Sequence, residues 1–81
     1  RLRRLVRDAV VDVETSENLV VVKTFPGAAQ GVASAIDQAA WPGVVGTVAG
    51  DDTFLIVVKP RRRAADVRDR LRAVLAGEKE Q

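Results

Sequence analysis

The chain has 81 residues and a mass of 8.7 kDa, the size of one small domain. Cysteine and histidine both number 0, which excludes disulfide bonds, thiolate zinc sites and catalysis by a histidine base. The formal net charge is +2, and arginines are concentrated in two segments of the chain, residues 1–7 and 61–63. Domains this small usually need a disulfide, a metal or a partner chain to be stable. We therefore expect a partner chain.

The sequence contains 0 methionines, which favours a piece of a longer protein. We expect residues 1–4 to be the end of an interdomain linker, residues 5–76 to form the domain and residues 77–81 to be a frayed tail. No apolar run approaches the ~20 residues of a membrane span, and no signal-peptide pattern is visible. We therefore expect no membrane partner.

The first half of the chain predicts two strands and a helix. Alternating apolar residues predict a strand from Leu5 to Glu14. This alternation divides its side chains between two faces, with Ala9, Val11 and Val13 on one and Val6, Val10 and Asp12 on the other. A four-residue turn, 15–18, leads to a strand at 19–24 that is apolar on both faces. After Pro26-Gly27, residues at 3.6-residue spacing predict a helix over 28–40.

The second half repeats this order. Trp41-Pro42-Gly43 ends the first helix, and strands are predicted over 44–49 and 53–59. Gly50-Asp51-Asp52 joins them as a tight turn, because these residue types tolerate the backbone angles of hairpin turns. A second helix is predicted over 64–76, with Gly77 at its C-terminal cap position.

This ββαββα order predicts an α+β fold: one four-stranded, mostly antiparallel sheet with both helices on one face. The strand at 53–59 is apolar on both sides, with Phe54, Ile56 and Val58 facing one way and Leu55 and Val57 the other. Two helices cover only one face of such a sheet. Since soluble monomers rarely leave a large apolar patch exposed, we expect oligomerisation to bury the other face.

Two groups of polar residues suggest a binding site. Gln30, Ser34 and Asp37 share one face of the first predicted helix. The turn at Gly50 places two adjacent carboxylates, Asp51 and Asp52, between small residues that allow close approach of a ligand. Neighbouring carboxylates favour a nearby cation. Magnesium or calcium is one option, but a guanidinium suits a carboxylate better because the two form paired hydrogen bonds.

Two segments closely resemble the C-terminal domain of the bacterial arginine repressor. They are Thr24-Phe25-Pro26-Gly27-Ala28-Ala29-Gln30, followed by Ala33-Ser34-Ala35-Ile36-Asp37, and Gly46-Thr47-Val48-Ala49-Gly50-Asp51-Asp52-Thr53. Their combination and separation make the resemblance specific, and it extends from about Leu5 to Leu75. It departs from the family only at residues 41–43, in a connection that varies within the family.

The resemblance implies a cytoplasmic domain that forms homotrimers, and homohexamers built from two stacked trimers. It implies L-arginine as a corepressor bound between the trimers, with no other cofactor and no metal. It also implies an upstream winged helix-turn-helix domain, absent here, through which alone operator DNA would be bound. Transcription of arginine metabolism genes would then respond to arginine.

The resemblance also assigns roles to individual residues. Gln30 and Asp37 would hold the α-amino and carboxylate end of arginine. Backbone groups of three residues would line the pocket: Thr47, Ala49 and Gly50. The guanidinium would reach Asp51 or Asp52 of a subunit in the facing trimer. Which of the two acts across the interface stays open.

Three other functions compete with this one. A nucleic-acid-binding sheet would use stacking aromatics, whereas this chain has only Phe25, Trp41 and Phe54. The run Arg61-Arg62-Arg63 then reads as a solvated loop. An enzyme would need Asp37 and the turn aspartates as an acid/base pair, and no nucleophile motif accompanies them. A regulatory domain that senses another small amino acid is the remaining alternative.

Overall fold

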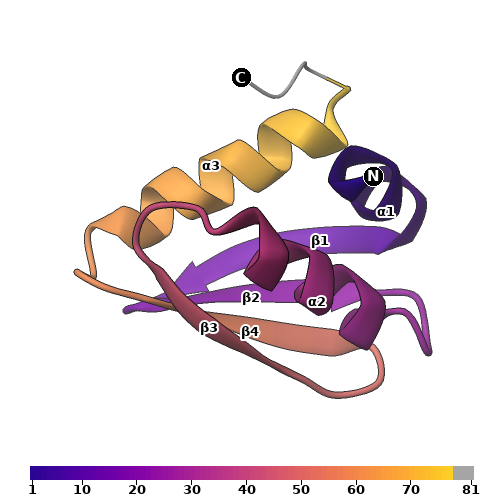
Figure 1. Ribbon diagram of the computed structural model, residues 1–81, viewed down its shortest axis with the longest axis horizontal. Helices are drawn as coiled ribbons and strands as arrows, with labels where there is room; N and C mark the ends of the chain where they lie inside the picture. The colour runs from indigo at the N-terminus through magenta and orange to yellow at the C-terminus, as the bar shows by residue number, and fades with distance from the viewer. Residues whose placement is uncertain (78–81) are drawn as a thin grey trace.

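Three helices and four strands make up the fold, seen in a computed structural model that describes residues 1–77. They follow in the order α1 (Leu2–Ala9), β1 (Val10–Ser16), β2 (Leu19–Thr24), α2 (Ala29–Ala39), β3 (Val44–Ala49), β4 (Thr53–Val58) and α3 (Arg63–Leu75). The strands form one antiparallel sheet in the order β1-β2-β4-β3. The helices lie together on one side of it (Figure 1). The predicted α+β fold with the ββαββα order is confirmed, with one additional helix at the N-terminal end.

The additional helix is α1, and it corrects our expectation of a strand beginning at Leu5. Leu2, Leu5, Val6 and Ala9 recur at the i, i+3, i+4, i+7 spacing of a helix face. Val6 is fully buried, and the other three pack against the core. Residues 2–4, which we expected at the end of a linker, are the first turn of this helix.

A β-bulge in β1 corrects the predicted division of its side chains. Val10 pairs with Thr24 and Asp12 with Lys23, so Val11 is an extra residue that the partner strand does not match. As a result Val10 and Val13 both point into the core, whereas Val11 is 56% exposed. We had placed Val11 beside Val13 and on the opposite face from Val10.

The other element boundaries lie within one residue of those predicted, apart from the first turn. β1 continues through Thr15 and Ser16, so only Glu17 and Asn18 form the turn. Gly77 follows α3 with a positive φ of 89°, as its predicted capping position requires. The rest of the predicted tail, 78–81, lies outside the described residues. No helix in the described part of the chain is both long and apolar enough to span a membrane.

The core lies between the sheet and the helical layer. Its largest fully buried side chains come from both layers: Phe54, Ile56, Ile36, Leu71 and Val6. Trp41, which follows α2, is also buried, and the Arg70 guanidinium of α3 lies 4.4 Å from the centre of its ring. The connection at residues 41–43 therefore packs against α3. It lies at the opposite end of α2 from the turn Gly50-Asp51-Asp52, which we call the acidic turn.

The second face of the sheet is apolar in its middle and lies open. Val21 of β2 pairs with Leu55 of β4, and Leu55 pairs in turn with Val48 of β3. These three residues therefore form a row across the sheet, on the face opposite the buried Phe54 and Val20. Val48 is 64% exposed. Within residues 1–77, no helix covers this face (Figure 1). We call it the open face.

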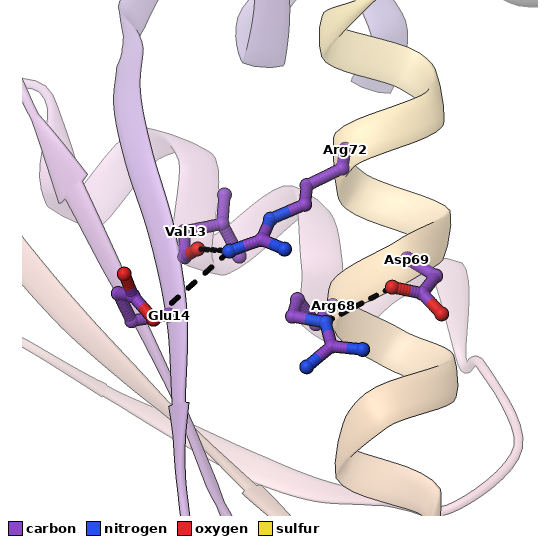
Figure 2. A network of polar contacts seen from close by, with 5 residues as sticks. All are labelled: Val13, Glu14, Arg68, Asp69 and Arg72. Atoms are coloured by element: carbon purple, nitrogen blue, oxygen red, sulfur yellow. Dashed lines mark hydrogen bonds and ion pairs between the residues drawn. The ribbon is translucent and has the colours of Figure 1, made fainter.

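One edge of the sheet is held by an arginine of α3. The Arg72 guanidinium donates a hydrogen bond of 2.6 Å to the Val13 carbonyl oxygen and lies 4.0 Å from the Glu14 carboxylate. Figure 2 shows this contact from α3 to β1, beside the local pair of Arg68 with Asp69 on the same helix. Arg72 thus satisfies a carbonyl at the edge of the sheet and fixes α3 against β1.

Candidate functional site

The acidic turn joins the two strands furthest from β1. Gly50, Asp51 and Asp52 connect β3 to β4, and the Gly50 amide donates to the Thr53 carbonyl at 2.9 Å. Both aspartate side chains are exposed. The Asp52 carboxylate accepts a hydrogen bond of 3.1 Å from the Thr53 hydroxyl. The predicted tight turn is therefore confirmed, with both carboxylates presented to solvent.

Backbone carbonyls of the same turn hold the start of α2. The Asp51 carbonyl accepts hydrogen bonds from the amides of Gly27 (3.0 Å) and Ala29 (3.2 Å). The Asp52 carbonyl accepts one of 2.7 Å from the Thr24 amide. The first amides of a helix have no partner within the helix, and α2 has no side-chain cap. The turn provides that cap and so fixes the two carboxylates next to the N-terminus of α2.

The opposite end of α2 contacts β3 directly. The Thr47 hydroxyl donates a hydrogen bond of 2.9 Å to the Asp37 carboxylate. Gln30, in contrast, lies in the first turn of α2, beside the residue that the Asp51 carbonyl caps. The predicted site residues therefore follow one continuous strip along α2, β3 and the acidic turn. We call this the α2–β3 strip: Gln30, Asp37, Thr47, Ala49, Gly50, Asp51 and Asp52.

Negative charge without a counter-charge marks the strip. Asp37, Asp51 and Asp52 are all exposed, and in the part of the chain that the structure describes none of them is in an ion pair. Three uncompensated carboxylates along one surface favour a cationic ligand. A planar guanidinium with several N–H donors suits them, because it can form paired hydrogen bonds with a carboxylate. On a single copy the three carboxylates of the strip are open to solvent.

The described residues do not suggest a metal centre at this strip. Across residues 1–77, no three acidic side chains are grouped in a way that could hold a metal ion. Of the strip's carboxylates, Asp37 and Asp52 each already accept a hydrogen bond from a threonine hydroxyl. This arrangement leaves lone pairs on both for further N–H donors of an organic ligand.

Two features of the site were not predicted from the sequence. We expected Thr47 to contribute backbone groups, whereas its hydroxyl also fixes the orientation of Asp37. The capping of α2 by the Asp51 carbonyl was not foreseen either. Backbone carbonyls are common to every residue type, so no sequence signal could have identified this contact. The Thr47 contact could have been suspected, because side chains alternate between the two faces of a strand. Val48 is exposed on the open face, so Thr47 must point to the helical side, where Asp37 lies.

Comparison with known proteins identifies a family for this chain. A family model described as "Arginine repressor, C-terminal domain" matches residues 6–73. A curated arginine repressor from Pelotomaculum thermopropionicum is 58% identical over 95% of the chain and 51% of its own length. Those from Desulforudis audaxviator and Symbiobacterium thermophilum are 56% and 53% identical, over 95% and 93% of the chain and 51% and 50% of their own lengths. The chain spans about half the length of these relatives.

Proposed function

This chain belongs to the arginine repressor C-terminal domain family, and from that premise we propose that it binds L-arginine and assembles the regulator to which it belongs. The observation that supports this most is the α2–β3 strip, where three exposed carboxylates have no counter-charge in the described residues. L-Arginine supplies a guanidinium and an α-ammonium group, the two cations that such a strip can bind.

In the proposed complex, the two ends of arginine meet different parts of the strip. Gln30 and Asp37 of one copy bind the α-amino and carboxylate end. The guanidinium reaches Asp51 or Asp52 of a facing copy, where a carboxylate can accept two parallel N–H bonds. The Thr47 hydroxyl holds Asp37 in place at 2.9 Å. The acidic turn is held by the carbonyl bonds to Thr24, Gly27 and Ala29, so little ordering is required when the ligand binds.

Two separate surfaces support the proposed assembly. The open face, with Val21, Leu55 and Val48 in a row, is the surface that three copies bury when they form a trimer. The α2–β3 strip involves the helical side of the sheet and the edge strand β3. A trimer built on the open face therefore leaves the strip free to meet a second trimer. Arginine would lie at that second contact.

A ligand shared between two trimers couples binding to assembly. Because it binds the hexamer and not the separated trimers, arginine stabilises the hexamer, by about 2.7 kcal/mol for each occupied site at a hundredfold excess over its dissociation constant. Sites at one shared interface then influence each other. In the intact regulator this would set how the DNA-binding portions are presented, so that transcription of arginine metabolism genes responds to arginine.

Light scattering with and without ligand tests this proposal. We expect the molar mass of the assembly in solution to double on addition of L-arginine, because trimers pair into hexamers. Citrulline is the matched control, because it replaces the guanidinium by a neutral urea group of similar shape. It should leave the mass unchanged. Equal responses to arginine and citrulline, or no response to either, would contradict a charge-selective ligand site between trimers.

A further inference from the structure

The outward side of α1 is an array of arginines. On this helix of 8 residues, Leu2, Leu5, Val6 and Ala9 face the core. At 100° per residue, the same winding places the arginines on the opposite side. Arg3, Arg4 and Arg7 are exposed, as is Arg1 immediately before the helix. We call these four residues the α1 arginine cluster.

The cluster has little negative charge to balance it. Its four arginines and Asp8 line a shallow surface hollow of about 310 Å³. Across residues 1–77, none of the four guanidiniums forms an ion pair. Arg61 at the other end of the fold differs, because it forms an ion pair of 2.7 Å with Glu17. Asp8 is the one carboxylate that lines the hollow, so the α1 arginine cluster retains an excess of positive charge.

The geometry of the cluster suits a linear polyanion. Four guanidiniums are spread over about 9 Å of helix axis, a charge density of the same order as one phosphate per about 3.4 Å along each strand of duplex DNA. An anionic membrane is a less suitable partner. Helices that lie on a membrane insert their apolar side between lipids, whereas the apolar side of α1 packs against the protein core.

We propose that the α1 arginine cluster contacts the phosphate backbone of duplex DNA, without reading its sequence. Such contacts hold and orient a protein on DNA but do not specify a site. We still expect operator DNA to be recognised only through an upstream domain; the domain described here would add phosphate contacts that do not depend on sequence. These contacts are independent of arginine binding, because the cluster and the α2–β3 strip share no residue.

Fluorescence anisotropy of the 81-residue chain with a labelled duplex of arbitrary sequence tests the proposal. Each phosphate contact contributes about −0.9 to the slope of log affinity against log salt concentration. For three to four contacts we expect a slope near −3, so affinity falls roughly 60-fold between 50 and 200 mM KCl. A second duplex of unrelated sequence should bind equally well. Absence of binding at 50 mM KCl, or a strong preference for one sequence, would overturn the proposal.

A matched pair of double variants distinguishes DNA binding by the α1 arginine cluster from a general effect of net charge. Arg3→Ala with Arg4→Ala should reduce the steepness of the salt slope by about 2 units and weaken binding at least tenfold at 50 mM KCl. Arg61→Ala with Arg62→Ala removes the same charge at the other end of the fold and should change affinity less than twofold. Equal losses in the two double variants would show that only net charge matters, and would refute the assignment to α1.

Further variants and measurements show whether a loss of binding has another cause. Arg3→Gln with Arg4→Gln should reproduce the alanine result, whereas Arg3→Lys with Arg4→Lys should retain binding, since a phosphate contact needs only the positive charge. Circular dichroism and an L-arginine titration on each variant report folding and the ligand site independently of DNA. Finally, vesicles containing phosphatidylserine should not bind the chain at 100 mM KCl. Binding to vesicles without binding to DNA would overturn the proposal in favour of a lipid surface.

Discussion

Replacing Asp52 by alanine is expected to abolish measurable L-arginine binding while the chain still folds and still forms trimers. The reason lies in how Asp52 is used. Its backbone carbonyl holds the Thr24 amide at 2.7 Å, and alanine keeps that carbonyl. Its side chain is exposed, and within residues 1–77 its one hydrogen bond is with the neighbouring Thr53 hydroxyl. The substitution therefore removes the charge and leaves the hydrogen bonds that hold the turn.

The size of the effect follows from the ligand guanidinium, which would stay buried at the interface without its carboxylate partner. Removing one member of a buried, hydrogen-bonded charge pair costs about 2–5 kcal/mol, or roughly 30-fold to several thousandfold in affinity. Isothermal titration calorimetry with L-arginine measures this loss, and sedimentation checks the trimer. Asp69→Ala is the control, since it removes an exposed carboxylate of α3 that pairs with the adjacent Arg68. Normal binding heats for the Asp52 variant would refute the assigned role of this residue.

Introducing a glutamate at Leu55 is expected to convert the trimer into a monomer. Leu55 lies at the centre of the open face, paired with Val21 on one side and Val48 on the other. In a trimer built on this face, a carboxylate at that position would be buried without a partner, which proteins do not tolerate. In the monomer the same side chain would remain in water. The substitution should therefore disrupt assembly far more than folding.

Sedimentation velocity without ligand distinguishes the two species. The unaltered chain should sediment as a trimer or larger at micromolar concentration, and the Leu55→Glu variant as a monomer with unchanged circular dichroism. Ala39→Glu is the matched control, because it adds the same charge at an exposed position of α2 on the helical side. It should remain trimeric. A stable monomer of the unaltered chain, or a trimer of the Leu55→Glu variant, would show that the open face is not the assembly surface.

Local signals in the sequence were sufficient for most of the fold. Pro26-Gly27, the Gly50 turn and Gly77 each mark an element boundary by backbone chemistry, and the structure has boundaries at these places. The two-sided apolar character of β4 was also correctly predicted, with Phe54, Ile56 and Val58 buried. These features depend on residue type and spacing over a few positions.

The largest error falls where two elements meet without a turn. α1 ends at Ala9 and β1 begins at Val10, so no glycine, proline or polar turn residue separates them. The valines of β1 and the apolar residues of α1 were then read together as a single alternating strand. The spacing of Leu2, Leu5, Val6 and Ala9 was the available signal for a helix. The bulge at Val11 had no such signal, because it depends on how β1 pairs with β2.

The candidate site was predictable in its residues but not in how it is held together. Acidic residues in a glycine-containing turn indicate a cation site from their chemistry alone. Their placement beside the start of α2 depends on backbone contacts between Asp51 and residues 27 and 29, which are more than 20 positions away along the chain. The hydrogen bond from Thr47 to Asp37 likewise depends on α2 packing against β3. Such contacts arise from the tertiary fold and leave no local pattern.

The most direct test of a cation enclosed between two copies is a crystal structure of the chain grown with L-arginine. We expect electron density for the ligand between facing trimers, with its guanidinium against Asp51 or Asp52 of one copy and its α-amino end near Gln30 and Asp37 of another. A hexamer in which the acidic turns face each other with no ligand between them, at saturating arginine, would contradict this. So would arginine bound wholly within a single copy.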